Sequence, residues 1–242
     1  MQKIFGRKPV LEALKSKADI DQIYIQYGLQ GSIVDHIKQL AKRNNVKLSQ
    51  ISPQKFNQLT EDKNTQGIIA VKNEFNYSQI DEILIEAEKS EFPLLLLLDS
   101  IQDPHNLGAI IRTAECAGAN GIIITTKNSA SVNNTVEKTS AGATSHIKIT
   151  QANNLVNTIE ILKQSGYWIV GSKLGNSQNY TSIDYKQPIA IVVGNEEKGI
   201  RHLVAEKCDF LAEIPMKGKI QSLNVSVATG VLLFEVLRSR SI

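Results

Sequence analysis

The 242-residue sequence has no long apolar run and only two cysteines. Its longest apolar stretch, PLLLLLD at residues 93–99, suits a buried strand and is far too short to span a bilayer. The N-terminal segment carries charges throughout and has no apolar core, so no secretory signal is expected. Cys116 and Cys208 do not form a CxxC pair, which favours a reducing compartment. We therefore expect a cytoplasmic protein that has no membrane partner.

Several catalytic signatures are also missing from the sequence. No HExxH motif and no Cys/His cluster is present, and the four histidines are scattered, so no metal site is expected. No GxSxG nucleophile elbow occurs. No GxGxxG follows an expected strand, which argues against nicotinamide dehydrogenases and the common Rossmann-like methyltransferases. These common chemistries are therefore set aside.

Charge is distributed unevenly along the chain, although the formal net charge is only +3. Residues 1–75 hold 12 Lys and Arg against 7 Asp and Glu, a net of +5, whereas the remainder holds 15 against 17, a net of −2. A basic first segment is compatible with contact to a polyanion. On charge alone, an ordinary solvated lysine-rich surface explains the same pattern.

The hydrophobic patterning predicts two domains, at residues 1–75 and 93–242, with a helical linker at 76–92. With 42% apolar residues, the chain can bury a sizeable core. The first domain is expected to be a small α/β sandwich. Its expected helices are 3–16, 31–44 and 52–59, and its expected strands are 21–26, 46–50 and 66–72. Helix 52–59 opens with Ser52 as N-cap and Pro53 at the first helical position.

The second domain alternates strands and helices, which predicts a mostly parallel sheet covered by helices on both faces. The expected strands are 94–99, 121–125, 146–149, 167–172, 189–193 and 209–214. The expected helices are 106–118, 133–141, 153–165, 200–206 and 222–240. Ligands of such sheets bind beyond the carboxyl ends of the strands. We therefore expect the site in the loops after residues 99, 125, 193 and 214.

The first of these loops leads into DPHNLGAIIRTAECAG, residues 103–118. Asn106 is a plausible N-cap of the helix, and Gly108 permits a close approach to its first turn. Arg112 lies off the apolar stripe of this helix. It is either a surface residue paired with an acid such as Glu115, or an arginine directed at a phosphate.

The other two loops also carry polar residues at strand ends. In IAIVVGNEEKGI, Gly194 permits a tight turn whose backbone can face a ligand, although a plain charged turn is the alternative. The third stretch, AEIPMKGKIQSLNVS, leads into the last helix, whose opening turn carries the polar residues Ser222, Asn224 and Ser226. The stripe expected to be buried on this helix consists of Leu223, Val227, Gly230, Val231 and Phe234. Buried polar groups need partners, so the polar residues should be bonded to neighbouring loops, Arg112 or substrate.

Together the three stretches resemble the three motifs of the SpoU (TrmH-like) family of RNA ribose 2′-O-methyltransferases. The matching residues are Asn106, Gly108 and Arg112 in motif one, Gly194, Asn195, Glu196 and Gly199 in motif two, and Ile214, Pro215, Met216, Gly218, Ser222, Leu223, Asn224, Ser226 and Ala228 in motif three. IFGRKPVLEAL also resembles the start of the family's L30e-like substrate-binding domain. SASVNNTVEKTSAGATSHIKI, residues 129–149, is similar to the branch that methylates a guanosine of 23S rRNA. The resemblance covers essentially the whole chain.

The resemblance implies an α/β fold in which a C-terminal parallel-sheet domain with a deep trefoil knot follows a small N-terminal L30e-like domain. It implies S-adenosylmethionine as cofactor and a homodimer with its active site near the subunit interface. The implied reaction transfers a methyl group to the ribose 2′-hydroxyl of a guanosine in 23S rRNA. Methylation of tRNA or of another rRNA nucleotide, and a non-catalytic RNA-binding relative, remain as alternatives.

Residue roles follow from the same resemblance. The implied catalytic residues are Arg112, Asn106, Glu196, Ser222 and Asn224. The implied cofactor-binding residues are Thr125, Thr126, Gly194, Asn195, Gly199, Ile214, Met216 and Leu223. The candidates for RNA contact are Arg7, Lys8, Lys15, Lys17, Lys42, Arg43 and Lys47. Because arginine stays protonated, Arg112 is expected to hold a phosphate and stabilise the developing alkoxide rather than act as the base, with Glu196 as its acidic partner.

Overall fold

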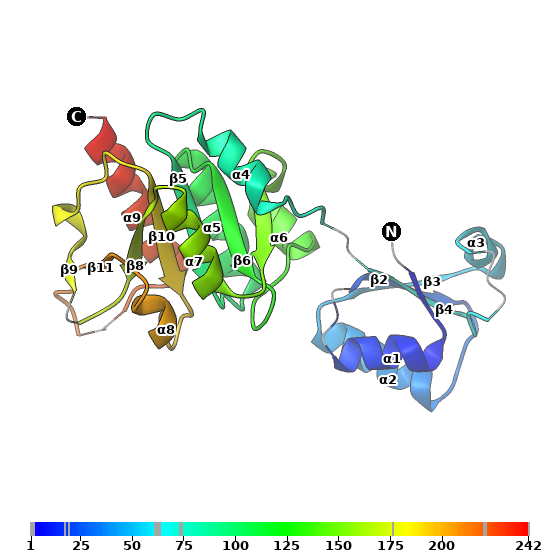
Figure 1. Cartoon of the computed structure of the whole chain (residues 1–242). Coiled ribbons are helices and arrows are strands. Elements are labelled where there is room, and N and C mark those ends of the chain that lie inside the picture. Colours follow the sequence, from blue (N-terminus) through cyan, green and yellow to red (C-terminus); the bar gives the residue numbers. More distant parts are fainter. Residues whose placement is uncertain are drawn as a thin grey trace. The chain divides into compact units, whose positions relative to one another are not determined.

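A computed structural model describes residues 3–16, 18, 20–60, 64–72, 75–175, 177–219 and 222–241 of the chain. The chain divides into two compact units, Met1–Phe75 and Asn76–Ile242 (Figure 1). Each unit has its own sheet, and the two are described separately below. No helix of the described residues is long and apolar enough to cross a membrane.

The first unit is a four-stranded mixed sheet with the strand order β1-β4-β2-β3. Strands β1–β4 and β4–β2 pair antiparallel, and β2–β3 pair parallel. Its core joins helices α1 and α2 to strands β2 and β4 through buried residues such as Val10, Ile37, Ile23 and Ile68. The elements are β1 (Lys3–Phe5), α1 (Arg7–Lys15), β2 (Ile20–Gln26), α2 (Ser32–Arg43), β3 (Lys47–Ile51), α3 (Pro53–Gln58) and β4 (Ile68–Lys72).

The start of this unit differs from the single helix expected at residues 3–16. Lys3–Phe5 is a strand that pairs with β4, and the helix begins only at Arg7. Gly6 separates the two with φ 93°, a backbone conformation outside the helical region that glycine adopts without steric cost. The expected cap of α3 is confirmed, because the side chain of Ser52 accepts a hydrogen bond from the Lys55 N–H and Pro53 occupies the first turn.

The second unit is a seven-stranded sheet in which every pairing of the described strands is parallel. Its strand order is β7-β6-β5-β10-β8-β11-β9. The strands are β5 (Leu94–Asp99), β6 (Gly121–Thr125), β7 (Ile149–Ala152), β8 (Trp168–Ser172), β9 (Gln178–Asn179), β10 (Ile189–Gly194) and β11 (Phe210–Glu213). The helices are α4 (Ile80–Ala87), α5 (Pro104–Cys116), α6 (Asn134–Thr139), α7 (Leu155–Gln164), α8 (His202–Ala205) and α9 (Val225–Arg240).

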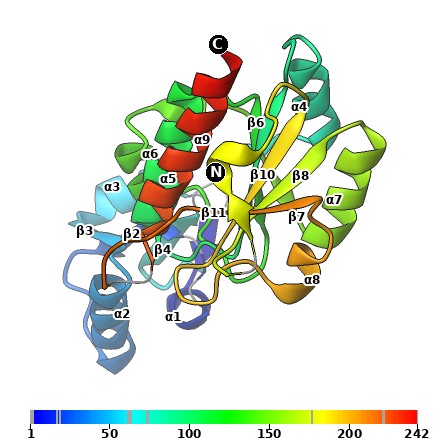
Figure 2. The ribbon, with the colours of Figure 1, turned by 90° about the vertical axis from the view of Figure 1, so that its left-hand side faces the viewer.

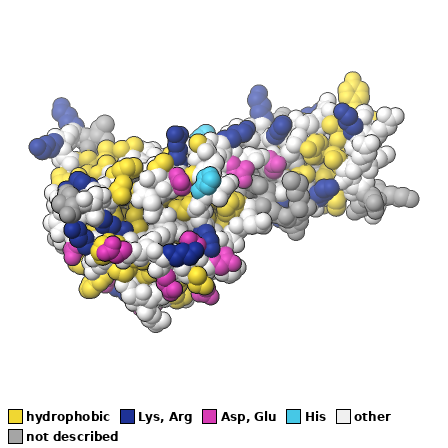
Figure 3. Space-filling view, turned by 90° about the horizontal axis from the view of Figure 1, so that it is seen from above, with side chains coloured by type: hydrophobic (Ala, Val, Ile, Leu, Met, Phe, Trp, Pro, Cys, Tyr) yellow, Lys and Arg dark blue, Asp and Glu magenta, His cyan; other side chains and the backbone are white. Residues whose placement is uncertain are grey.

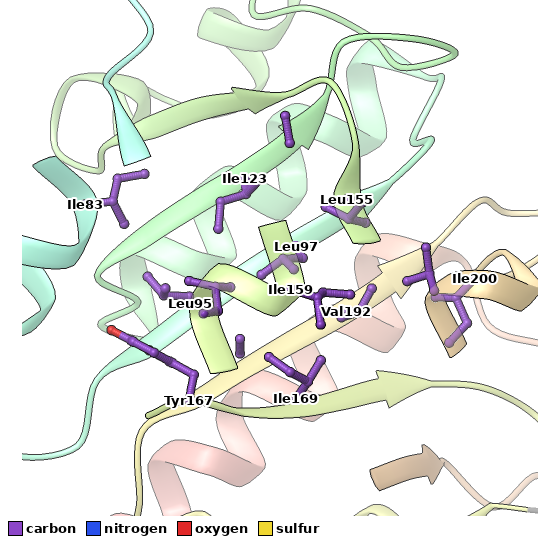
Figure 4. Close-up of a cluster of buried hydrophobic side chains, with 14 of the residues drawn as sticks. Ile83, Leu95, Leu97, Ile123, Leu155, Ile159, Tyr167, Ile169, Val192 and Ile200 are labelled. Carbon is purple, nitrogen blue, oxygen red and sulfur yellow. The ribbon is translucent and has the colours of Figure 1, made fainter. Parts of the chain in front are cut away.

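Helices cover both faces of this sheet, as the alternation of elements predicts (Figure 2). Helices α5, α6 and α9 lie on one face, and α4, α7 and α8 lie on the other. The core beneath α4, α7 and α8 is mainly aliphatic and includes the fully buried side chains of Leu95, Leu97, Ile159 and Val192 (Figure 4). The expected fold class is thus confirmed, while the trefoil knot stays a prediction of the family resemblance.

Two expected elements of the second unit have a different role or position. Helix α4, expected within a linker, packs on the sheet and buries Ile83 and Ala87 in its core. Strand β7 begins at Ile149, three residues later than expected, because residues Ala143–Ser145 form a 3₁₀ turn before it.

The last helix buries a different face from the one expected. Its buried residues are Val225, Thr229, Leu232, Leu233, Glu235 and Val236. The expected stripe is instead exposed in part: the side chains of Leu223, Val227 and Phe234 are 39%, 52% and 48% accessible. The helix begins at Val225 rather than at residue 222, so the polar residues Ser222 and Asn224 precede it. Spacing alone identified an apolar stripe but not which of two apolar faces meets the sheet.

Arg240 connects the end of α9 to the segments that precede strands β5 and β10. Its guanidinium donates hydrogen bonds to the carbonyl oxygens of Phe92 at 2.6 Å, Tyr185 at 2.9 Å, Gln187 at 3.0 Å and Pro93 at 3.3 Å. Burial lowers the pKa of this guanidinium to about 10, so it stays charged at neutral pH. One side chain thus joins α9 to the start of β5 and to the segment before β10.

Replacing Arg240 with alanine should destabilise the second unit by about 2–4 kcal/mol, because four carbonyl oxygens lose a charged donor at once. Urea denaturation followed by circular dichroism measures this change. Lys89→Ala is the control, since Lys89 is an exposed cation of the same unit that pairs at the surface with the partly exposed Glu86, three residues before it. Equal losses in the two variants would contradict the assignment.

Candidate functional site

The carboxyl ends of four neighbouring strands meet at one edge of the large sheet. Strand β5 ends at Asp99, directly opposite Gly194 at the end of β10, and Ser172 and Glu213 end β8 and β11. In the sheet, β6 and β7 lie on one side of β5, and β10 lies on its other side. The direction in which successive strands are added therefore reverses at β5. Such a switch point in a parallel sheet is where ligands bind.

The loop after β10 closes on itself at Gly194. The N–H and C=O groups of Asn195 and Gly199 exchange two hydrogen bonds, at 3.1 and 2.9 Å. A Cβ atom on Gly194 would lie only 2.1 Å from the carbonyl carbon of Gly199 and the nitrogen of Ile200. No side chain fits there, so the expected tight turn requires glycine at position 194. Gly199, with φ 65°, completes the turn.

Asp99 holds the far end of this loop. Its side chain is fully buried, and it accepts hydrogen bonds from the Arg201 backbone N–H at 2.9 Å and from Arg201 Nε at 2.7 Å. The near end is held by Asn195, whose Nδ2 donates to the Ser100 carbonyl oxygen at 3.2 Å. Neither Asp99 nor Arg201 was expected in the site. The available signal was a single carboxylate at the end of the run LLLLLD.

A chain of side-chain hydrogen bonds joins the three motifs. Asn106 Nδ2 donates to Glu196 Oε1 at 2.8 Å, and Asn224 Nδ2 donates to Asn106 Oδ1 at 3.0 Å. A carboxylate can only accept, so the amide of Asn106 must turn its NH₂ group to Glu196 and its oxygen to Asn224. Residues 90 and 118 positions apart are thereby connected in one network.

The role expected for Asn106 as an N-cap is wrong. Helix α5 begins at Pro104, and Asp103 caps it by accepting a hydrogen bond from the His105 N–H at 2.9 Å. Asn106 lies in the first turn, where its side chain is free to face motifs two and three. Gly108 does permit a close approach, as expected, and the approaching group is helix α6: a Cβ there would lie 2.6 Å from Thr139 Cβ.

The polar residues before α9 have separate roles. Asn224 is the N-cap, and its Oδ1 accepts hydrogen bonds from the Ser226 N–H at 2.9 Å and Ser226 Oγ at 2.6 Å. Asn224 is thus bonded to motif one and to Ser226, as expected, although it is exposed rather than buried. Ser222 is exposed and lines a cavity.

That cavity, of about 400 Å³, lies at the ends of β10, β8 and β11. A volume of this order is typical of small-molecule sites. Of the expected cofactor-binding residues, Gly194, Asn195, Gly199, Ile214, Met216 and Leu223 line it, and so do Glu196 and Ser222. Part of the lining was not expected from the sequence, namely Ser172, Lys173, Leu174, Ala212 and Glu213. These residues end or follow β8, or end β11. The sequence does not reveal that β8 lies next to β10 in the sheet, with β11 beyond it.

Thr125 and Thr126 are not among the residues that line this cavity. Thr125 Oγ1 accepts a hydrogen bond from the Ser100 N–H at 3.2 Å and bonds with Ser129 Oγ. Thr126 Oγ1 donates to Asn153 Oδ1 at 3.0 Å. Both threonine side chains therefore bond to residues of neighbouring loops.

Arg112 lies apart from the motif network. It is two thirds of the way along α5, about 9 Å and about 120° around the helix from Asn106. Its side chain is exposed, and no hydrogen bond or ion pair joins it to another described residue. The expected pair with Glu196 is not formed, because Asn106 and Asn195 bind that carboxylate. The surface pair with Glu115 is not formed either.

The basic residues expected to contact RNA lie on several elements of the first unit. Arg7 and Lys8 begin α1, while Lys15 at its end pairs with Glu12 at 2.8 Å. Lys42 and Arg43 end α2, and Lys47 begins β3. Lys17 lies outside the described residues. On the face drawn in Figure 3, basic side chains are scattered over both units rather than gathered in one patch.

Comparison with known proteins assigns both units. Residues 93–234 match the SpoU rRNA Methylase family. The chain belongs to this family. Residues 3–78 match the domain described as RNA 2′-O ribose methyltransferase substrate binding, which agrees with a SpoU chain made of two units.

Some relatives of this SpoU chain match it over nearly its full length, and others over part of it. A putative TrmH family tRNA/rRNA methyltransferase, YacO, of Bacillus subtilis is 37% identical, covering 98% of this chain and 96% of the relative. The structure of an AdoMet-bound rRNA methyltransferase from Sinorhizobium meliloti is 29% identical with a TM-score of 0.63, covering 98% of this chain and 86% of that one. A TrmH/SpoU tRNA modifying enzyme of A. aeolicus is 32% identical with a TM-score of 0.59, covering 67% and 82%.

Replacing Asp99 with asparagine should loosen the loop at residues 194–201. The new NH₂ group cannot accept a hydrogen bond from either Arg201 donor, so one of the two bonds is lost inside the protein. We expect a loss of about 1–3 kcal/mol in the free energy of unfolding. Faster hydrogen exchange of the Asn195 and Gly199 amides should accompany it.

The matched control is Glu206→Gln, which changes an exposed carboxylate that pairs with His202 at the surface of α8. Unchanged stability and amide exchange in Asp99→Asn would show that the Asp99–Arg201 pair does not hold this loop.

Proposed function

We propose that this SpoU chain transfers a methyl group from S-adenosylmethionine to the ribose 2′-hydroxyl of a guanosine in 23S rRNA. The observation that carries the proposal is the cavity at the strand ends, which residues of motifs two and three line while Asn106 of motif one bonds to both. Membership of the family, the substrate-binding match of the first unit and the names of the relatives support RNA as the substrate.

The cavity fits S-adenosylmethionine in its chemistry. Leu174, Ile214 and Leu223 offer apolar surface to an adenine ring, and strand-end backbone groups can bond to its edge. The charged lining residues are of both signs: Lys173, Lys198, Glu196, Glu197 and Glu213. Such a lining suits a ligand that carries a sulfonium, an ammonium and a carboxylate group. When bound, this cofactor supplies an electrophilic methyl group. The AdoMet-bound relative from Sinorhizobium meliloti supports the same assignment.

The residues of the chain then act on the ribose. A 2′-hydroxyl is a weak nucleophile that must lose its proton as it attacks, so charge develops on its oxygen. Arg112, a permanent cation without a partner among the described residues, can hold the adjacent phosphate and stabilise that charge. Ser222 lines the cavity. Asn106, Glu196 and Asn224 already bind one another and so act by holding the motif loops in register.

The choice of a 23S guanosine rests on the resemblance of the first unit and of residues 129–149. In the structure these residues include α6, which packs directly on α5 at Gly108. Through this contact, the packing of α6 on α5 can affect the position of the motif-one residues on α5. A tRNA ribose is the second candidate, favoured by the likeness to the A. aeolicus tRNA modifying enzyme.

We further propose that the chain acts as a homodimer through α9. Val227, Phe234 and Leu237 expose 52%, 48% and 41% of their side chains along this helix. Exposed apolar residues repeated along one helix favour an interface. Helix α5 packs against α9 where Thr113 Cγ2 lies 3.5 Å from the position a Cβ on Gly230 would take. Arg112 precedes Thr113, so it lies beside the face that a second copy would cover.

The reaction can be tested by mapping ribose 2′-O-methylation across rRNA and tRNA in cells with and without the protein. One guanosine of 23S rRNA should lose its methyl group in the deletion and regain it with the intact chain. Loss at a tRNA ribose instead would select the second candidate. Loss at no site, together with no heat on titration with S-adenosylmethionine, would identify a non-catalytic RNA-binding relative.

The role of Arg112 predicts a split between turnover and cofactor affinity. Arg112→Lys keeps the charge but not the planar fork, so turnover should fall by about 100-fold or more while the Kd for S-adenosylmethionine stays within about twofold. Transfer of a labelled methyl group and calorimetry measure the two quantities. Near-normal turnover in this variant would contradict the role.

The interface predicts that Phe234→Glu yields a monomer, since a carboxylate placed in an apolar contact must be desolvated. Light scattering coupled to size-exclusion chromatography measures the mass. Leu203→Glu is the matched control, because Leu203 is an exposed leucine on α8, away from α9. A dimer that persists in Phe234→Glu would exclude this face.

A further inference from the structure

The proposed methyl transfer still lacks a side chain that accepts the proton of the ribose. The 2′-hydroxyl must lose this proton as it attacks, and Arg112 is a permanent cation that cannot take it. A general base acts only within hydrogen-bond reach of the hydroxyl that it deprotonates. We therefore expect the acceptor between Arg112 and the cavity at the strand ends.

The carboxylates beside the cavity are poorly suited to this task. Both oxygens of Glu196 already accept hydrogen bonds, from Asn106 Nδ2 at 2.8 Å and from Asn195 Nδ2 at 3.2 Å. Glu197 and Glu213 also line the cavity. A carboxylate in ordinary surroundings binds a proton too weakly to be an effective base at neutral pH, whereas an imidazole exchanges protons readily there.

The structure describes all four histidines of the chain, and His105 is the one that belongs to a motif. His36 lies on α2 of the first unit, and His146 follows the 3₁₀ turn before β7. His202 on α8 lies 3.5 Å from a carboxylate oxygen of Glu206. The side chain of His105 is exposed and forms no hydrogen bond or ion pair with another described residue.

The start of α5 places His105 at the edge of the sheet where the cavity lies. Its backbone is fixed, because the His105 N–H donates to the capping carboxylate of Asp103 at 2.9 Å. The next residue, Asn106, bonds to Glu196, which lines the cavity. His105 thus immediately precedes the side chain through which motif one contacts the cavity wall.

His105 and Arg112 share the outer face of α5. Seven residues apart in a helix, they differ by only about 20° in rotation and by about 10 Å along the axis. The opposite face, which carries Leu107 and Ile110, is buried. Between the two polar residues lies Ala109, whose side chain is a single methyl group. An imidazole and a guanidinium therefore flank one stretch of helix surface on which a sugar can lie.

A ribose and its neighbouring phosphate match this pair of groups. We propose that His105 is the general base of the methyl transfer, while Arg112 holds the phosphate next to the same ribose. The 2′-hydroxyl gives its proton to an imidazole nitrogen, and its oxygen forms a bond to the methyl carbon with the freed electron pair. The bond from that carbon to sulfur breaks with its electrons on sulfur, and the imidazolium then releases the proton to water.

This inference rests on the proposed function for the reaction and adds a residue that was not among the expected catalytic residues. It also separates two tasks on α5. His105, at the start of the helix, handles the proton, and Arg112, two turns later, handles the negative charge of the phosphate.

Chemical rescue on the full chain tests the role of His105. The assay transfers a labelled methyl group to rRNA and tRNA purified from cells that lack the protein. His105→Ala should lower turnover by about 100-fold or more, and added imidazole should raise it again by about tenfold or more, because a free base replaces the missing one. Arg112→Lys should gain nothing from imidazole, since the base is still present in that variant.

Two further measurements separate this role from a structural one. His105 is exposed, so His105→Ala should leave the melting temperature unchanged and keep the Kd for S-adenosylmethionine, measured by calorimetry, within about twofold. His146→Ala is the matched control, because it removes an exposed histidine of the same unit outside the three motifs. It should keep the turnover of the unaltered chain with and without imidazole.

Unchanged turnover in His105→Ala, or a loss that imidazole does not restore, would overturn the role of His105 and leave the proposed function intact. An unaltered chain that methylates none of the purified RNA would instead refute the proposed function, and the role of His105 with it.

Discussion

The buried carboxylate of Asp99 is the interaction on which the arrangement of the site depends. It ends the central strand β5 and binds the backbone and side chain of Arg201, which fixes one end of the loop after β10. The other end is fixed where Gly194 meets the Gly199–Ile200 peptide without room for a side chain. With both ends held, Glu196 faces Asn106, and Asn106 in turn binds Asn224. Three segments that are distant in the sequence thus acquire one defined geometry.

The strand ends could be predicted from the sequence, whereas their order in the sheet could not. Alternating apolar segments located β5, β6 and β10 closely, and each motif lay after a strand. Nothing local showed that β8 and β11 lie beyond β10, so Lys173 and Glu213 were missed as parts of the cavity wall. Asp99 was missed for a similar reason, because its importance comes from a partner 102 residues away.

The last helix illustrates a different limit of sequence patterning. It has two apolar faces, and periodicity cannot state which one meets the sheet. The expected stripe of Val227 and Phe234 is exposed, and Leu232, Leu233 and Val236 are buried instead. The polar residues before it were informative for a physical reason. Asn224 both caps the helix and contacts Asn106, so a single side chain ends one element and positions another.

The contact between Asn106 and Asn224 also sets the order in which the site can form. The first motif leaves the ribosome more than a hundred residues before Asn224, the residue that completes its hydrogen bonds. The sheet can assemble strand by strand during synthesis, but the cavity gains its last wall only when the segment before α9 has been made. A nascent chain therefore holds its complete first unit long before it holds a complete site for chemistry.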